Sequence, residues 1–419
     1  MLSNKPAYQY MNTKIPSKND ITLTILVILG FVLMPFGRSV EVTTALLMLA
    51  GIYYVLKTSK FSLSSIPAAR LYVLLFMLIW VPTLVSAIDS TDFKRSIIFC
   101  ILYLRYLFAG LVVIYLFQQR ELKKWVLLSL CVVVLVWVSD SFIQWLFGVD
   151  LLGREYIGGR LTGPFDKLIL PIYLSVLLPF TLLYVAQKTN AWGFLLILVM
   201  SLWVLLLAGG RASFFVLLLA GLLYLFYQFI SQQKKSWLLS MLFIGIFIVG
   251  GIVAYHQSPM VEARVDKTAL VFKGDYESID KATSYRLPLW KTAYTMGLDH
   301  LFNGYGVKNF RQGFQYYASA GNKYEKIGAM HPHLFFLETF AETGLIGVLG
   351  SLLIPLVLFR FYTGNIRSMP PTHAVSMITV LVVFFPFNAH VSFYGSVYSQ
   401  VAWVMVAISC ACLGDDELA

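Results

Sequence analysis

Two histidines near the start of an apolar segment are the residues in this chain best suited to acid–base chemistry. His331 and His333 follow a polar stretch, and the apolar segment that they precede contains Glu342. Histidine titrates near neutral pH, so a histidine at this place could exchange a proton with a hydroxyl group. We therefore take His333 as the candidate catalytic residue, with His331 and Glu342 as secondary candidates. A buried structural histidine is the alternative.

Three arginines occur in contexts that suit an anion. Arg160 lies in a loop rich in glycine, and Arg211 lies in a very short glycine-containing turn between two apolar segments. Arg286 stands at the start of a predicted helix, one turn before Trp290. Arginine side chains can clamp a diphosphate, in part through paired hydrogen bonds. A solvated or snorkelling arginine remains the alternative at each position.

The pattern of possible metal ligands favours a site without metal. His331 and His333 are two residues apart, and no third ligand follows at a spacing typical of zinc enzymes. The four cysteines all lie in apolar runs and are predicted to be small buried side chains. His390, in a turn after Asn388, is a further secondary candidate.

The composition places these residues in a membrane protein. The chain has 419 residues, of which 58% are hydrophobic and 13% charged, whereas soluble domains have about 25% charged residues. Apolar runs such as 192–207 and 237–253 are long enough to cross a bilayer as helices. In a membrane protein, an excess of Lys and Arg has a topological cause and sometimes a substrate cause, so the net charge of +11 does not indicate binding to nucleic acid.

The hydropathy pattern predicts an all-α integral membrane protein with about 12 transmembrane helices. The predicted spans are 20–36, 40–56, 67–87, 97–117, 125–146, 168–187, 192–208, 213–231, 236–255, 333–359, 371–388 and 392–413. With a cytoplasmic N-terminus, the short loops on the cytoplasmic side have about twice as many Lys and Arg residues as those outside. All the candidate arginines and histidines then face the side away from the cytoplasm.

The chain is predicted to divide into three regions. Residues 1–255 form the first nine transmembrane helices, 256–332 a large basic loop outside the cytoplasm, and 333–419 the last three transmembrane helices. The loop is predicted to be partly helical, with one helix from Arg286 to Leu298 and Ser284 as its N-cap. A second short helix is predicted over 309–317.

The spacing of these residues resembles the bacterial O-antigen ligase and polymerase superfamily. The span after the large loop matches the family pattern of His, Leu and Glu-x-Gly-x-x-Gly, except that Leu334 replaces the usual Asn. Three further segments resemble family motifs in the same order along the chain. The matching residues are Arg160 to Phe165, Gly209 to Ala212, Arg286 to Trp290 with Gly304 to Phe310, and His333 to Gly347.

The resemblance implies a membrane glycosyltransferase of GT-C-like architecture in the bacterial inner membrane, with its active site on the periplasmic face. The donor would be a glycan on undecaprenyl diphosphate, and neither a metal nor another cofactor would be needed. Arg160, Arg211 and Arg286 would hold the diphosphate. His333 would accept the proton of the acceptor hydroxyl, and the large loop would cover the site and exclude water.

Several functions share these motifs. O-antigen ligase is the first choice: it would transfer the glycan to the lipid A-core during lipopolysaccharide biosynthesis, and the basic loop suits this anionic acceptor. O-antigen polymerase and protein O-oligosaccharyltransferase are the alternatives within the family. A transporter of polyprenyl-linked glycans is the alternative outside enzymes. Against it, the apolar spans contain few ionisable residues, mainly Arg105 and Asp140, whereas transport pathways usually need more of them within the membrane.

Overall fold

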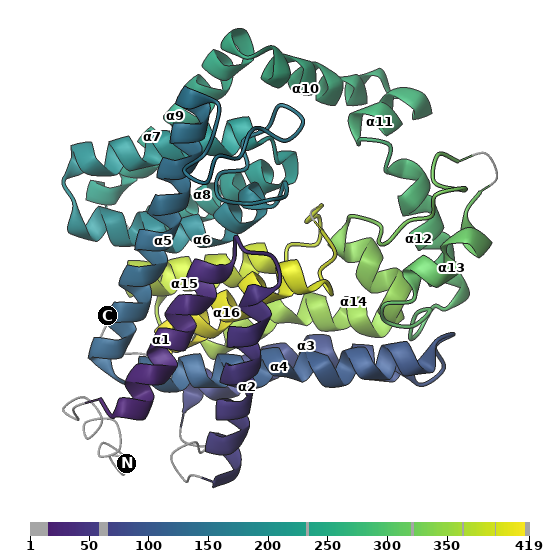
Figure 1. The fold of residues 1–419 in the computed structure, drawn as a ribbon, viewed down its shortest axis with the longest axis horizontal. Coiled ribbons are helices and arrows are strands. Elements are labelled where there is room, and N and C mark those ends of the chain that lie inside the picture. Colours follow the sequence, from purple (N-terminus) through teal and green to yellow (C-terminus); the bar gives the residue numbers. More distant parts are fainter. Residues whose placement is uncertain are drawn as a thin grey trace.

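The computed structural model describes six stretches of the chain, and within them the regular structure is helical (Figure 1). These stretches are 16–57, 66–231, 234–319, 322–362, 364–389 and 391–414. Pairing of the β type is confined, in the same stretches, to two isolated bridges in the loop after α5. The predicted all-α integral membrane fold is confirmed.

Helices occur at all the places where the sequence predicts spans. They are α1 (Lys18–Leu33), α2 (Ser39–Lys57), α3 (Pro67–Ala87), α4 (Phe93–Phe117), α5 (Arg120–Phe147), α6 (Leu170–Lys188), α7 (Ala191–Ala208), α8 (Arg211–Ser231), α9 (Lys234–Gln257), α14 (Phe335–Phe361), α15 (Pro371–Val383) and α16 (Ser396–Leu413). Among the described residues, nine helices are long and apolar enough to cross a membrane, or up to ten if a bent pair is one span. The predicted number of 12 is therefore not confirmed, because α1 and α15 are short.

Four further helices and a 3-10 turn lie between α9 and α14. They are α10 (Pro259–Ala269), η1 (Leu270–Lys273), α11 (Tyr276–Ala282), α12 (Leu287–Asp299) and α13 (Phe310–Tyr317). The chain bends by 109° between α9 and α10, and Figure 1 shows α10 and α11 crossing as an arch towards α12. The two helices expected in this loop correspond to α12 and α13.

The predicted N-cap of α12 is wrong. Arg286 is the N-cap residue, and Ser284 has a φ of 62°, a left-handed conformation outside the helix. The carboxylate of Asp280 instead accepts a hydrogen bond from the amide of Leu287, at 3.0 Å. This bond satisfies one of the amides that the first turn of a helix leaves unpaired. The cap thus comes from the preceding helix, which local sequence cannot reveal.

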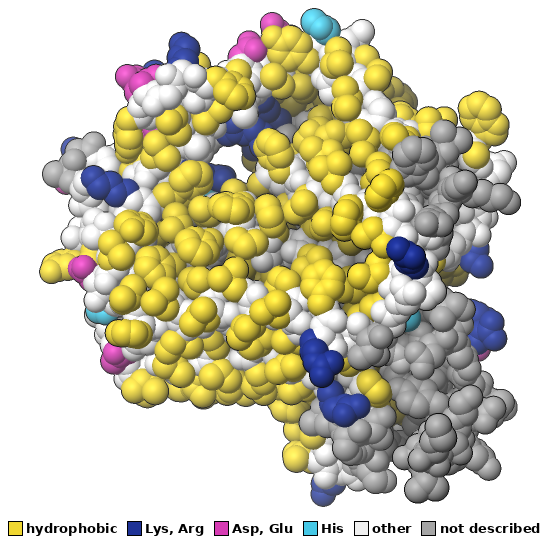
Figure 2. All heavy atoms as spheres, turned by 180° about the vertical axis from the view of Figure 1, so that it is seen from behind, with side chains coloured by type: hydrophobic (Ala, Val, Ile, Leu, Met, Phe, Trp, Pro, Cys, Tyr) yellow, Lys and Arg dark blue, Asp and Glu magenta, His cyan; other side chains and the backbone are white. Residues whose placement is uncertain are grey.

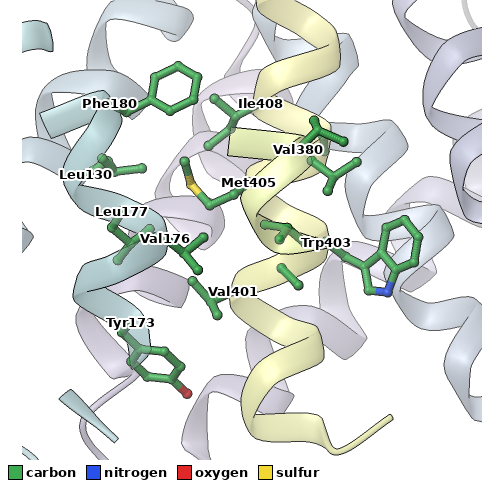
Figure 3. Packing of buried hydrophobic residues seen from close by; sticks show 14 of the residues in the cluster. Leu130, Tyr173, Val176, Leu177, Phe180, Val380, Val401, Trp403, Met405 and Ile408 are labelled. Carbon is green, nitrogen blue, oxygen red and sulfur yellow. The ribbon is translucent and has the colours of Figure 1, made fainter. Parts of the chain in front are cut away.

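The core lies where α5, α6, α15 and α16 pack together (Figure 3). Tyr173 and Leu177 of α6 face Val401 and Met405 of α16. Each of these side chains is at most 2% exposed, and inside a bilayer such helices are held together by close van der Waals packing rather than by removal of apolar surface from water. The helices that end at the site are therefore held in fixed positions.

A break in α14 joins the large loop to this helical core. Gly344 has φ 62° and ψ −159°, so the helix is interrupted there. The amides of Leu345 and Ile346 donate to the carbonyls of Leu301 and Phe302 at 2.8 and 3.1 Å. A Cβ at Gly344 would collide with the backbone of Phe302, so this close contact requires glycine. Main-chain bonds thus fix the loop against the helix that follows His333.

Candidate functional site

The loop that carries Arg160 is ordered by polar side chains at the end of α5. The amide oxygen of Gln144 accepts hydrogen bonds from the backbone amides of Thr162 and Gly163 at 2.9 and 3.0 Å. Asp140, one helical turn earlier, accepts from another backbone amide of the same loop at 2.7 Å. These bonds satisfy an irregular backbone at the edge of the membrane core. They also fix the backbone of the loop that carries Arg160.

Arg211, the first residue of α8, reaches from the helical core into the large loop. Its guanidinium donates three hydrogen bonds of 2.7 Å, to the hydroxyl of Thr268, the carbonyl of Ala282 and the hydroxyl of Ser284. These groups lie in α10, at the end of α11 and just after it. All three acceptors are neutral, so Arg211 keeps its full positive charge while it holds the arch above α8.

Arg286 links the large loop to the segment between α15 and α16. Its Nη1 donates to the carbonyl of Ala389 at 2.9 Å. Burial, and then the charge of Arg211, lower the pKa of Arg286 from its usual value. One turn later, the indole of Trp290 donates to the carbonyl of Pro332 at 3.1 Å. The first turn of α12 is therefore bonded both to the segment before α16 and to the turn that contains His331 and His333.

His331 and His333 form a hydrogen-bonded pair, in which Nε2 of His331 lies 3.1 Å from Nδ1 of His333. His333 has a φ of 56°, a conformation that is rare for residues with a side chain. Burial lowers the pKa of His331 to about 3, and the charges of His333, Lys308 and Arg286 act in the same direction. His331 is therefore neutral at physiological pH and lies close to the cations of the site.

The predicted arginines come together, and two further cations join them. Arg160 and Arg211 repel each other electrostatically, and both repel Arg264 and Lys267 of α10. Arg286 is near enough to Arg211 to be repelled as well. We call these five residues the cation cluster. In Figure 2, Lys and Arg side chains line a hollow beneath the arch.

Among the described residues, no carboxylate pairs with the cation cluster: none of its five members forms an ion pair with Asp or Glu. Like charges held together without counter-ions lower the stability of the apo protein. Such an arrangement is typical of a site that binds a multiply charged anion.

Two glutamates at the start of α14 bind backbone rather than a substrate. Glu342 accepts hydrogen bonds from the amides of Lys308 and Phe310 at 2.8 and 3.3 Å. Glu338, which sequence analysis missed, accepts from the hydroxyl of Ser392 and from the amide of Phe393. Both carboxylates are buried. They position the loops on either side of His333, so Glu342 is a positioning residue in this structure.

Unusual backbone conformations concentrate around the site. Within the described stretches, the non-glycine residues with positive φ are Ser284, Tyr285, Lys308 and His333. Such conformations cost roughly 1–3 kcal/mol each and persist where the surrounding structure enforces them. Two of the four, Ser284 and His333, carry side chains that make the contacts described above.

The sequence-based candidates therefore have different outcomes. Arg160, Arg211 and Arg286 share one cluster, beside His331 and His333, while Trp290 supports the histidine turn and Glu342 binds backbone. His390 lies outside the described residues, although its neighbour Ala389 contacts Arg286. Sequence reasoning missed Arg264 and Lys267, because α10 was not predicted. Their i, i+3 spacing in a basic loop was the available signal.

Residues that could hold a metal ion do not gather in the described part of the chain. Among those residues, no group of three or more His, Cys, Asp or Glu side chains is arranged to hold a metal ion. The cation cluster would also repel a metal ion.

The sequence matches one known family. Residues 195–352 match the family model described as O-antigen ligase. The match covers the segment from α7 to α14, which contains Arg211, Arg264, Arg286 and His333. No curated protein matches the chain. This segment is similar to the O-antigen ligase family, whose members are membrane glycosyltransferase-like enzymes that act on lipid-linked glycans and membrane-bound acceptors.

Proposed function

We propose, from the match of residues 195–352 to the O-antigen ligase family and from the cation cluster beside His333, that the chain is an O-antigen ligase. It would transfer a glycan from undecaprenyl diphosphate to the lipid A-core on the periplasmic face of the inner membrane. The observation that carries the proposal is the meeting of Arg160, Arg211 and Arg286 without carboxylate partners in the described stretches. These arginines come from three separate segments: the loop after α5, the start of α8 and the start of α12.

The cation cluster suits the diphosphate leaving group. As the bond between the anomeric carbon and the diphosphate oxygen breaks, negative charge develops on that oxygen. Guanidinium groups already in place stabilise this charge without reorganising. Because Arg211 is held by three neutral acceptors, its position does not depend on the ligand. Arginines would thus supply the neutralisation that other glycosyltransferases obtain from a metal ion.

The histidine pair suits a general base. The acceptor hydroxyl oxygen attacks the anomeric carbon, and its proton passes to His333. Because His331 stays neutral, its Nε2 can accept a hydrogen bond from the Nδ1–H of His333 across the 3.1 Å between them. In this tautomer Nε2 of His333 takes the proton. His331 would then act as a positioning residue, as an orienting partner does in other catalytic pairs.

The position of the site suits substrates that are carried in the membrane. The surface seen in Figure 2 is largely hydrophobic, as expected for a surface that contacts lipid, and Lys and Arg side chains gather at the hollow in it. A polyprenyl chain could remain in lipid while its diphosphate enters the cluster. The alternating pattern of basic loops favours the periplasmic side.

Deletion of the gene in its host tests the proposal and its alternatives. We expect long polymer to accumulate on the lipid carrier while the lipid A-core stays bare, and wild-type protein but not His333→Ala to restore transfer. Polyacrylamide gels of lipopolysaccharide and extraction of the polyprenyl-linked glycan give the readout. Single repeat units on both carrier and core would identify a polymerase instead. Normal lipopolysaccharide in the deletion strain would contradict both functions.

A further inference from the structure

One face of α10 lies over the turns that carry the predicted arginines. Met260 is 3.4 Å from the position that a Cβ would take at Gly159, next to Arg160. Thr268, two turns further along, accepts the hydrogen bond from Arg211. Arg264 lies midway between them on the same face, since residues four apart follow one another along a helix.

The side chain of Arg264 lies directly on the backbone of Gly209. A Cβ at Gly209 would collide with its guanidinium, and Gly209 has a φ of 70°. Glycine is therefore required here both for the turn and for the contact. In the structure, the absence of a side chain at Gly209 leaves room for Arg264.

The Arg264 guanidinium is incompletely satisfied. Its Nη1 is buried and has no hydrogen-bond partner among the described residues. Its positive charge is repelled by those of Arg160 and Arg211. Among the described residues, no carboxylate forms an ion pair with Arg264. Burying an unpaired donor of a charged group is costly. A folded protein that retains this arrangement has a reason other than stability.

We propose that Arg264 is a ligand-binding residue of the anion site, which binds a phosphate group of the diphosphate together with Arg160 and Arg211. This inference rests on the proposed function and adds a residue that the sequence motifs do not include. The unpaired Nη1 would donate to a phosphate oxygen, and the ligand would supply the negative charge that the three arginines lack. Binding would also attach the arch to α8 through the ligand.

Arg264→Gln separates this role from a structural one. In the purified full-length protein, we expect it to weaken the binding of inorganic pyrophosphate by about 10-fold to 100-fold, as for loss of a charge-assisted hydrogen bond. Without pyrophosphate, we expect the thermal midpoint to rise, because a repelling charge is removed. A residue that only holds the arch would give a lower midpoint. Lys273→Gln, an exposed neutralisation in the same segment, is the matched control.

The outcomes distinguish this inference from the proposed function. Isothermal titration of wild-type, Arg264→Gln, Arg211→Gln and Lys273→Gln proteins with pyrophosphate gives the four affinities. Weakening in both arginine variants but not in Lys273→Gln supports the inference. Weakening in Arg211→Gln alone overturns it and leaves the proposed function intact. Failure of the wild-type protein to bind pyrophosphate would overturn the inference and contradict an anion site of the proposed kind.

Discussion

The packed interior around α16 differs from the outer mouth, by which we mean the cation cluster and the histidine pair below the arch, in whether the polar groups have partners. In the interior, Trp403 is 1% exposed, and its indole donates to the hydroxyl of Tyr103 at 2.8 Å. That hydroxyl also lies 3.2 Å from the hydroxyl of Ser399. At the mouth, by contrast, like charges meet, Arg264 has an unpaired donor and non-glycine residues adopt positive φ.

This contrast separates residues that stabilise the fold from residues that are kept for function. Interior side chains satisfy both packing and hydrogen bonding, so their replacement should cost stability. Mouth side chains violate these requirements, so many of their replacements should cost activity and leave stability equal or higher. Substitutions in the two regions test whether loss of stability and loss of activity separate between the interior and the mouth.

The largest expected effect is the loss of transfer in His333→Ala. We expect the rate to fall by about 10²-fold to 10⁴-fold, the range for removal of a general base. The thermal midpoint should change little, because the side chain is not part of the interior. Transfer of a lipid-linked donor in proteoliposomes gives the rate, and His256→Ala, at an exposed position at the end of α9, is the control. A rate within a few fold of wild type would remove His333 from the reaction.

Trp403→Ala should have the opposite profile. Loss of this side chain creates a cavity among Tyr72, Phe76 and Phe384, whose rings lie 4.9–6.0 Å from that of Trp403. We expect destabilisation of about 3–5 kcal/mol, measured by denaturation in detergent. The fraction that remains folded should keep its rate of transfer. Loss of rate per folded molecule would show that the interior also acts in the reaction.

Arg211→Lys tests the geometry of the mouth while its charge is kept. Lysine cannot make the forked contacts to Thr268, Ala282 and Ser284 that the guanidinium makes. We expect kcat to fall by about 10-fold to 100-fold, since a displaced cation stabilises the leaving group less well. Steady-state kinetics separates kcat from KM. Wild-type kcat in the lysine variant would mean that charge alone suffices.

The smallest expected effect is a dependence of stability on pH. The pKa of His331 is lowered to about 3 by burial, below its unfolded value of about 6.5. The unfolded state therefore binds a proton between these values, and stability falls as pH drops below about 6.5. At pH 5 the loss approaches about 2 kcal/mol. The thermal midpoint of the wild-type protein should be lower at pH 5 than at pH 7.5, and this difference should shrink in His331→Gln. An equal difference in both proteins would show that groups other than His331 cause the pH dependence.

The sequence was sufficient for much of the fold because membrane helices have a local signature. A long apolar run must form hydrogen bonds within itself, so α3, α6 and α8 lie within a few residues of their predicted bounds. The alternation of sides along the chain then predicted a common face for Arg160, Arg211 and Arg286. That prediction required no knowledge of side-chain contacts.

Features set by contacts between distant residues could not be predicted. Arg264 lies in a polar segment, and its role depends on the 109° bend before α10 and on contact with Gly209. Ser284 resembled a helix cap, but Arg211 holds its side chain elsewhere. Glu338 gave no local signal, since its partner Phe393 is 55 residues away. In each case an interaction across the fold outweighed the local pattern.

The break in α14 has a consequence for how this protein can change over generations. Loop and helix are joined there by main-chain bonds between 301–306 and 341–346, and these bonds are the same whatever side chains the neighbouring residues carry. Gly304, Gly306 and Gly344 must remain glycine, because a Cβ at any of the three would collide with neighbouring atoms. The side chains on the outer surface of the loop can therefore diversify over generations, while the backbone that joins the loop to α14 is inherited unchanged.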